Sequence, residues 1–360
     1  MPPPSDRDAP RKGRGASFNP ENRFFPTRSE RSDDGWNTEP DPLPPLHTTV
    51  TIQNSRTIIS RNTSPDIPFT MSINPYQGCE HGCIYCYARP SHAYLDLSPG
   101  LDFETKLFAK PNAAALLRQE LAKPGHQVST INIGANTDPY QPIEREWKIT
   151  RSLLEVLLET RHPVALITKN ALILRDLDLL RELAALHLVQ VFVSVTSLDP
   201  ALMRLMEPRA SAPHRRLHTI GQLAAAGIPV GAMVAPLIPF INDHEMERIL
   251  ERVAAAGATR AGYVFLRLPY ELKDLFRDWL QTHAPLKADR VMAAIQDARG
   301  GKDNNSDFGQ RMSGTGVFAE LLRQRFAVAV RRHGLNSARG NGLRTDLFRP
   351  PRLDGQLSLF

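Results

Sequence analysis

Residues 69–88 read FTMSINPYQGCEHGCIYCYA, a short apolar run followed by three cysteines with the spacing CxxxCxxC. The apolar run predicts a buried strand, which places Cys79, Cys83 and Cys86 on the loop after it. Cysteine thiolates are the usual ligands of iron–sulfur clusters, and a [4Fe–4S] cubane normally takes four ligands. The 360-residue chain contains no fourth cysteine. The loop therefore predicts a [4Fe–4S] cluster with one iron left open to a substrate or cofactor.

The alternative for this loop is a zinc site, completed by His81 or His92, in an interaction protein without catalysis. Zinc sites usually draw pairs of ligands from separated segments, whereas these three thiols lie within eight residues. The spacing therefore favours the iron–sulfur cluster. The odd cysteine count also argues against a disulfide framework and indicates a reducing compartment.

After residue 48, short apolar runs alternate with stretches in which apolar residues recur every three or four positions. The candidate strands are residues 69–74, 130–134, 164–168, 189–196, 230–235 and 261–266. The candidate helices between them are residues 113–121, 150–160, 172–186, 213–226 and 243–256. This alternation predicts an α/β fold with a parallel sheet of about six βα repeats, fewer than the eight of a closed barrel. A partial barrel and a doubly wound sheet both fit the pattern.

The two ends of the chain differ in composition from this body. Residues 1–47 mix charge, proline and serine, so we expect them to be mostly disordered, with residues 11–25 as a candidate segment for docking onto the body. The predicted barrel covers residues 48–284, a helical extension covers residues 285–345, and a flexible tail covers residues 346–360.

Charge and hydropathy narrow the location and the partners. The chain has 44 lysines and arginines against 38 acidic residues, a net charge of +6 that suits an anionic partner. The sequence shows neither a run of eighteen apolar residues nor an apolar leader. We therefore expect a cytoplasmic protein that does not cross a membrane.

Polar residues follow several of the predicted strands. Residues 134–142 follow the second strand, Thr168 and Lys169 end the third, and residues 194–197 end the fourth. Any one of these residues could serve as a turn or helix cap. In a barrel, however, the carboxyl ends of the strands share the functional face, so together these segments predict a cofactor-binding rim around the cysteine loop. Arg267, after the sixth strand, is a candidate for binding an anionic group or pairing with an acid.

The CxxxCxxC motif, with the aromatic Tyr85 before its last cysteine, resembles the radical S-adenosylmethionine (SAM) superfamily. Residues 67–79 and 86–88, with the strand-end segments, are similar to the spore photoproduct lyase-like, or DNA repair photolyase, group and within it to the PA0069-type radical SAM proteins. This resemblance, which covers residues 11–345, implies a partial (β/α)6 TIM-type barrel. It also implies a [4Fe–4S] cluster and SAM as cofactors, reductive cleavage of SAM to a 5′-deoxyadenosyl radical, and an electron donor such as flavodoxin or ferredoxin.

The same resemblance implies which side chains contact SAM. They are Tyr85 near the adenine, Lys169 and Ser194 at the methionine carboxylate or the ribose, Thr137 and Asp138 beside them, and Asn242 and Asp243 closing the adenine side.

One departure from this group concerns hydrogen-atom donation. The lyase uses an additional cysteine after its second strand to return a hydrogen atom to the product radical, whereas residues 134–138 of this chain read Gly-Ala-Asn-Thr-Asp. Thymine-dimer reversal by that route is therefore not expected, and the candidate hydrogen-atom donors are Tyr85, Tyr87 and Tyr140. Because all three cysteines are assigned, an auxiliary cysteine-ligated cluster is excluded.

The chain ends in QLSLF, which resembles the bacterial sliding-clamp-binding motif QLxLF. Its residues are Gln356, Leu357, Ser358, Leu359 and Phe360. The apolar side chains would fill pockets on the clamp while the glutamine forms hydrogen bonds at the rim; the alternative is that the tail folds back on the body. Together with the photolyase resemblance, the motif favours DNA or a nucleotide as substrate, with RNA, a small molecule or a protein as alternatives.

Overall fold

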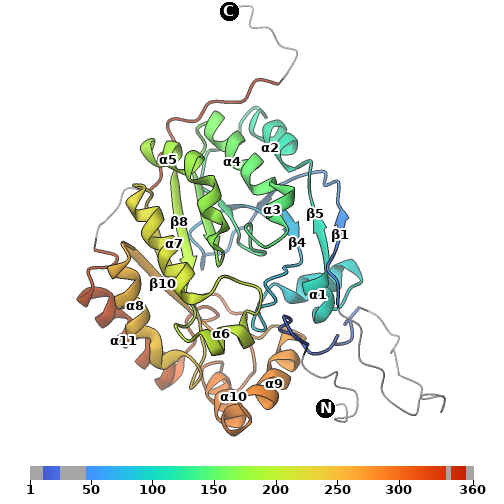
Figure 1. Cartoon of the computed structure of the whole chain (residues 1–360), viewed down its shortest axis with the longest axis vertical. Coiled ribbons are helices and arrows are strands. Elements are labelled where there is room, and N and C mark those ends of the chain that lie inside the picture. Colours follow the sequence, from blue (N-terminus) through green and yellow to red (C-terminus); the bar gives the residue numbers. More distant parts are fainter. Residues whose placement is uncertain (1–10, 25–45, 338–341, 354–360) are drawn as a thin grey trace, which may run out of the picture.

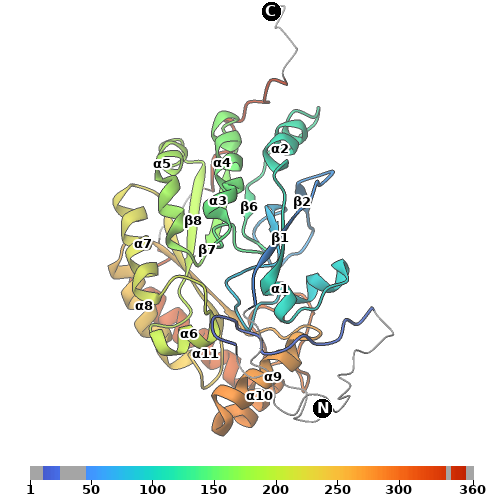
Figure 2. The same cartoon turned by 45° about the vertical axis from the view of Figure 1, so that its right-hand side comes forward.

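The computed structural model describes residues 11–24, 46–337 and 342–353. A parallel sheet lies at its centre, and helices cover the outer face of this sheet (Figures 1 and 2). Within the described residues, no helix is both long enough and apolar enough to cross a membrane.

The central sheet contains seven strands in the order β10-β9-β8-β7-β6-β3-β2. These strands are β2 (Ile59–Arg61), β3 (Met71–Ile73), β6 (Ile131–Ile133), β7 (Val164–Thr168), β8 (Val189–Ser194), β9 (Val230–Leu237) and β10 (Arg260–Phe265). All neighbours pair in parallel except β2 and β3, which form an antiparallel edge. The parallel strands from β3 to β10 therefore stand in the order in which they occur along the chain.

This strand order decides between the two folds that the sequence pattern allows. A doubly wound sheet reverses its order at a switch point and carries helices on both faces. Right-handed crossovers between strands in sequential order instead place the helices on one face. The order from β3 to β10 has no reversal, and the connecting helices lie outside the sheet (Figure 2). The fold is a partial (β/α)6 barrel, as the family resemblance predicted.

The helices that connect the strands turn an apolar face to the sheet. They are α2 (Ala113–Leu121), α4 (Ile149–Glu159), η3 (Ala171–Asp176) with α5 (Leu177–Ala185), α7 (Pro213–Ala225), and η4 (Asp243–Glu245) with α8 (Met246–Ala255). In α8, Ile249, Leu250 and Val253 are fully buried, at the spacing of one helical face. Gly227 and Gly257 follow α7 and α8 with φ of 74° and 104°, the left-handed conformation that glycine readily adopts at helix ends. The predicted strands and connecting helices are confirmed.

Further short elements occupy the loops after the strands and the C-terminal extension. They are η2 (Arg89–Leu95), α1 (Leu101–Thr105), α3 (Glu144–Trp147), α6 (Pro200–Met206), α9 (Leu272–His283), η5 (Pro285–Lys287), α10 (Ala288–Asp297) and α11 (Gly316–Arg332). A second sheet, of order β1-β5-β4, contains β1 (Thr49–Ile52), β5 (Lys106–Ala109) and β4 (Tyr76–Gln77). The sequence analysis did not predict this sheet, because β4 is only two residues long and β1 is mostly exposed, so neither has a clear apolar pattern.

Segments from the two chain ends pack on opposite ends of the barrel. Residues 11–24 lie against the cysteine loop. Residues 342–353 run over the other end, where the backbone N–H of Arg349 donates to the carbonyl of Thr160 at 2.8 Å, and they leave the molecule at the top of Figure 1. The predicted clamp motif, residues 356–360, and the rest of the segment predicted to be disordered lie outside the described residues.

Candidate active site at the cysteine loop

The cysteine loop, residues 79–86, lies at the carboxyl end of β3 and is held by neighbours on both sides. Gly82 has a φ of 66°, and a Cβ there would lie 2.8 Å from a carboxylate oxygen of Glu104 in α1, so this turn requires glycine. On the other side, the backbone N–H of Ile84 donates to the carbonyl of Met206 at 3.0 Å. The loop is therefore held between α1 and α6.

A buried ion pair stabilises the loop from below. Arg89 Nη2 lies 2.5 Å from Glu104 Oε1, and neither side chain is exposed. Arg89 Nε also donates to the carbonyl of Cys83 at 2.8 Å. A buried guanidinium needs such acceptors, because it no longer forms hydrogen bonds with water. The pair therefore fixes the backbone of the middle cysteine.

The N-terminal segment docks onto the same carboxylate. The backbone N–H groups of Gly15 and Ala16 donate to the two oxygens of Glu104 at 3.0 and 2.9 Å. A Cβ on Gly15 would lie 1.8 Å from the carbonyl oxygen of Gly82, so the two backbones are in direct contact. Residues 11–24 thus dock at the cysteine loop, as the sequence suggested.

The three thiols lie in a low-dielectric site. Cys79 and Cys83 are buried and Cys86 is partly buried. Burial raises the pKa of Cys83 and of Cys86, and the charges of neighbouring cysteines, with Glu207 in the case of Cys83, raise it further, whereas Lys169 lowers it. Ligation to a cationic cluster would offset this cost, because a coordinating thiol is deprotonated outright.

The donors around the loop fit a [4Fe–4S] cluster better than a zinc ion. The histidines proposed to complete a zinc site have other contacts: His81 Nδ1 lies 3.4 Å from Asp138 Oδ2, and His92 Nε2 lies 2.9 Å from the carbonyl of Lys106. No three histidine, cysteine or acidic side chains in the described ranges come close enough to hold one metal ion. A cubane does not need such a group, because each cysteine binds a different iron. The three cysteines would hold three irons and leave the fourth open.

Asp138 joins the cysteine loop to the ends of β6 and β7. Its carboxylate accepts hydrogen bonds from Thr168 Oγ1 and from the backbone N–H of Lys169, both at 2.7 Å, and faces His81. Burial opposes ionisation, but the charge of His81 and these hydrogen bonds lower the pKa of Asp138 to about 2. Through the backbone N–H of Lys169, Asp138 helps to position this lysine, beside which the family resemblance placed it.

Lys169 and Tyr85 lie near each other beside the loop, and Ser194 lies at the end of the neighbouring strand β8. Lys169 Nζ lies 5.9 Å from the centroid of the Tyr85 ring. The Tyr85 hydroxyl lies 3.3 Å from Oγ1 of Thr196, which follows the end of β8 at Ser194. Among the described residues, neither the Lys169 ammonium nor the Ser194 hydroxyl has a hydrogen-bond partner. Both groups therefore remain available for a carboxylate or a ribose.

The other predicted SAM contacts are engaged within the protein. Thr137 Oγ1 donates to a carbonyl of β4 at 2.9 Å, and Asn242 Nδ2 donates to the carbonyl of Thr196 at 2.8 Å. Asp243 faces α11, where Arg325 Nη1 lies 3.7 Å from its Oδ2. Thr137 and Asn242 thus make hydrogen bonds within the protein, and one oxygen of Asp243 faces Arg325 while its Oδ1 is buried without a hydrogen-bond partner among the described residues.

Of the three candidate hydrogen-atom donors, Tyr87 has the most open position. It directly follows the last cysteine, is 47% exposed, and donates a hydrogen bond to the carbonyl of Ala135. Tyr85 is buried. Tyr140 is also buried, and its pKa is raised by burial and by the nearby charge of Asp176. Only Tyr87 is therefore open to a substrate in this structure.

Sequence analysis did not identify a buried ion pair beside the loop. Arg216 pairs with Glu207, whose Oε1 also accepts a hydrogen bond from Thr196 Oγ1 at 2.8 Å. Burial raises the pKa of Glu207, and Arg216 opposes the shift. One sign was present in the sequence: Arg216 occupies the buried face of the helical pattern together with Ile220 and Leu223. Its partner could not be predicted, because Glu207 belongs to a different loop.

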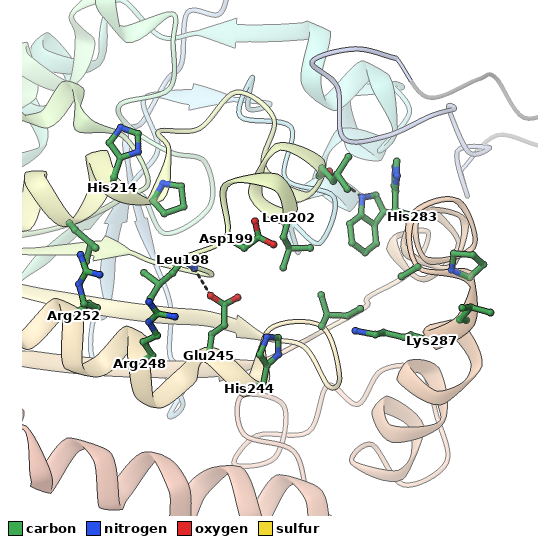
Figure 3. Close-up of a pocket in the computed structure, with 18 residues that line it drawn as sticks. Leu198, Asp199, Leu202, His214, His244, Glu245, Arg248, Arg252, His283 and Lys287 are labelled. Carbon is green, nitrogen blue, oxygen red and sulfur yellow. Dashed lines mark hydrogen bonds between the residues drawn. The ribbon is translucent and has the colours of Figure 1, made fainter.

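A separate cavity of about 960 Å³ opens outside the barrel, between α6, α7, α8 and η5 (Figure 3). Leu198 and Leu202 form part of its apolar lining, and Arg248 and Arg252 extend toward it from α8. Among the described residues that line it there is no cysteine and no side chain predicted to contact SAM. This cavity is therefore distinct from the site that the cysteine loop defines.

A partial barrel with a three-cysteine loop after its first parallel strand defines a class of iron–sulfur enzymes. A family model described as the Radical SAM superfamily matches residues 73–253, half of the chain. The chain therefore belongs to the radical SAM superfamily, whose members use a [4Fe–4S] cluster together with SAM. The chemistry of the donors at the loop agrees with these cofactors.

Two curated relatives are similar in sequence to part of this chain. Protein Rv2578c of Mycobacterium tuberculosis is 39% identical over 221 residues, which cover 61% of this chain and 65% of the relative. Protein MJ0683 of Methanocaldococcus jannaschii is 28% identical over 173 residues, which cover 48% of this chain and 62% of the relative. The chain thus spans less than two thirds of the length of either relative.

Solved structures of spore photoproduct lyase have a similar fold. The lyase complexed with dinucleoside spore photoproduct has a TM-score of 0.57 and 15% sequence identity, over 79% of this chain and 80% of that chain. A mutant of the lyase with bound AdoMet and dinucleoside spore photoproduct has a TM-score of 0.56. At this identity the likeness concerns the fold alone.

Proposed function

We propose that the chain is a radical SAM enzyme that acts on DNA or a nucleotide in a lyase-like reaction. The observation that carries this proposal is the loop with three buried or partly buried thiols at the carboxyl end of the sheet, beside Lys169, whose ammonium has no hydrogen-bond partner among the described residues. When bound, the cluster and SAM supply a 5′-deoxyadenosyl radical through one-electron cleavage of a carbon–sulfur bond. The protein holds both cofactors in place and keeps water away.

The residues of the rim have separate roles in this reaction. Cys79, Cys83 and Cys86 hold the cluster, and Lys169 with Ser194 orients SAM through its carboxylate or ribose. Tyr85 packs beside the adenine. We assign hydrogen-atom return to Tyr87, because it is the exposed tyrosine next to the cluster loop.

Three observations support a nucleic-acid substrate. The net charge of +6 suits a polyanion. The fold resembles that of a lyase whose solved complexes contain a dinucleoside photoproduct. The sequence ends in a motif similar to those that bind the sliding clamp. RNA, a small molecule or a protein is the alternative substrate.

Anaerobic reconstitution tests the radical SAM activity. We expect a brown protein with iron and sulfide that forms 5′-deoxyadenosine from SAM only when dithionite is present. Metal analysis of the same sample distinguishes the alternatives, because a zinc protein would be colourless and would not cleave SAM. A zinc-containing, inactive protein would overturn the proposal.

A labelled substrate tests the nucleic-acid assignment. Thymine-labelled DNA, either ultraviolet-damaged or undamaged, is incubated with the reduced enzyme and SAM, and the label is followed into 5′-deoxyadenosine. Transfer from damaged DNA alone supports a repair role. If label is transferred from RNA but from neither DNA, RNA is the substrate, and the proposed radical chemistry still holds.

We also propose two protein partners, the sliding clamp and an electron donor. A pull-down with the sliding clamp, using the full chain and a chain that lacks residues 356–360, tests recruitment, and equal capture of both chains would argue against it. Flavodoxin or ferredoxin would replace dithionite as the electron donor. Three free cysteines fit a reducing compartment such as the cytoplasm.

A further inference from the structure

Arg267 lies at the carboxyl end of the last parallel strand, two residues beyond β10. Its guanidinium carbon lies 5.5 Å from the centroid of the Tyr87 ring, which directly follows Cys86. In a barrel of this type, the carboxyl ends of the strands surround the reaction site. Arg267 therefore places a positive charge beside the ring that flanks the cluster loop.

This guanidinium has almost no acceptor in the structure. A guanidinium carries five N–H donors. Among the described residues, the one hydrogen bond of Arg267 runs from Nη1 to Met312 Sδ at 3.8 Å, and a thioether is a weak acceptor. Its Nε is buried and has no hydrogen-bond partner among the described residues. No carboxylate in the described ranges pairs with it. The alternative from the sequence, that Arg267 pairs with an acid, is therefore not what the structure contains.

Two further arginines lie near Arg267, and their positive charges favour the binding of an anion there. Arg311 is paired with Asp66 at 2.5 Å, and Arg299 donates to four backbone carbonyls and has no acid partner. In the described ranges, Asp66 forms an ion pair with Arg311 only, and neither Arg267 nor Arg299 forms one with a carboxylate. Burial lowers the pKa of Arg267 and lowers that of Arg299 to about 10, and repulsion between the arginines adds to both shifts. The described residues thus leave the Arg267 guanidinium without an ion-pair partner next to the exposed Tyr87.

We propose that Arg267 binds a phosphate group of the substrate, with Tyr87 packing beside the attached nucleoside. This inference rests on the proposed function and deepens it, because it identifies the part of a nucleotide that the site recognises. The planar guanidinium fork matches the paired oxygens of a phosphate. An exposed aromatic ring next to an arginine is also the combination that holds single nucleotides in many nucleic-acid sites. The phosphate belongs either to a free nucleotide or to a DNA strand.

Calorimetric binding to the reconstituted enzyme in the presence of SAM tests this inference. The probes are thymidine 5′-monophosphate, the dinucleotide thymidylyl-thymidine, and thymidine, which has no phosphate. We expect at least one phosphate-containing probe to bind about tenfold or more tightly than thymidine, and Arg267→Gln to remove that difference. Arg267→Lys should restore part of it, because lysine keeps the charge without the fork. Preference for the monophosphate indicates a free nucleotide, and preference for the dinucleotide indicates a strand.

Arg290→Gln is the matched control. Arg290 also lies over an aromatic ring, 3.9 Å from the centroid of Phe240, but it is exposed on the outer extension. We expect this variant to bind the probes as the wild type does. If thymidine binds as tightly as both phosphate-containing probes, or if Arg267→Gln binds them like the wild type, the inference is wrong.

Thermal unfolding without ligand separates binding from a structural role. Arg267→Gln removes an unpaired guanidinium from the neighbourhood of Arg299 and Arg311, so its unfolding temperature should equal or exceed that of the wild type. A clearly lower unfolding temperature would mean that Arg267 supports the fold, and would overturn the proposal. SAM cleavage by the wild type is measured in the same samples. Failure of cleavage with intact phosphate binding would reject the radical activity alone, and cleavage without phosphate binding would reject this inference alone.

Discussion

The two ends of the barrel differ in whether their polar side chains have partners within the protein. At the carboxyl end, Lys169 and Arg267 have no acid partner among the described residues, and Tyr87 is exposed. At the amino end, the rings of His162 and Phe348 lie 5.4 Å apart and His162 is fully buried. The difference shows where this fold keeps its binding capacity. Polar groups left without partners cost stability but can bind ligands, whereas a closed, packed end supports the fold.

The cysteine loop combines both behaviours. Its thiols remain available for a cluster, but the backbone that carries them rests on the fully buried pair of Arg89 and Glu104. Substitutions can therefore separate the function of the carboxyl end from the stability of the whole barrel. The following predictions are ordered from the largest expected effect to the smallest.

Replacing Cys83 by alanine should abolish the function of the carboxyl end without unfolding the barrel. We expect loss of stoichiometric iron and sulfide, and 5′-deoxyadenosine formation at background level, because one of three cluster ligands is missing. The apo-protein should change its unfolding free energy by only about 1 kcal/mol. Iron analysis, a dithionite-dependent cleavage assay and urea unfolding measure these effects. Normal iron content and normal cleavage would refute the cluster assignment.

Glu104→Gln should break the support beneath the loop. It leaves Arg89 buried without a charge partner, so we expect the apo-protein to lose about 3–5 kcal/mol of unfolding free energy. Urea unfolding measures the loss, and limited proteolysis should show easier cleavage within residues 11–24. Glu146→Gln is the control, because Glu146 is exposed, and it should stay within about 0.5 kcal/mol of the wild type. Equal stability of the two variants would contradict the role of the buried pair.

The amino end should respond to acid through His162. Burial, with the nearby charge of His126, lowers the pKa of His162 to about 4, below its value of about 6.5 in an unfolded chain. As the pH falls, the unfolded state therefore binds the proton before the folded state does. The contribution of His162 to stability is complete above pH 6.5 and falls as the pH drops from 6.5 to about 4. The loss is at most about 1.4 kcal/mol for each pH unit.

His162→Gln should flatten this part of the stability curve in urea unfolding between pH 7 and 4. His218→Gln is the control, because His218 is exposed, and its curve should parallel that of the wild type. A curve for His162→Gln that also runs parallel to the wild type would show that His162 does not titrate between these pH values.

Lys169→Met should weaken SAM binding at the carboxyl end by about tenfold, or about 1.4 kcal/mol, because the carboxylate loses a cationic partner. Equilibrium binding of SAM to the cluster-loaded protein measures the effect. Lys123→Met, on the exposed surface, is the control and should bind SAM normally. Unchanged affinity in Lys169→Met would remove this lysine from the SAM site.

Prediction from the sequence was most successful where the relevant residues are close along the chain. The alternation of apolar runs and helical patterns correctly located the strands from β3 to β10, and Lys169 lies at the end of one of them, near Tyr85 of the cysteine motif. Sequence reasoning was least informative for side chains whose partners lie on another element. It did not indicate that Asp243 faces Arg325 or that Asp138 accepts from Thr168, because helix and loop packing decides where those carboxylates point.

By itself, the sequence determined the metal chemistry and the repeating architecture. Three thiols within eight residues are brought together by a single loop, and the spacing of apolar residues sets which face of each strand or helix is buried. Only the tertiary structure decided which charged groups have partners: Glu104 accepts a hydrogen bond from the backbone of Gly15 in a distant segment, while Arg267 has no acid partner among the described residues. The physical reason is that an ion pair requires two groups within a few ångströms in space, and separation along the chain does not specify that distance.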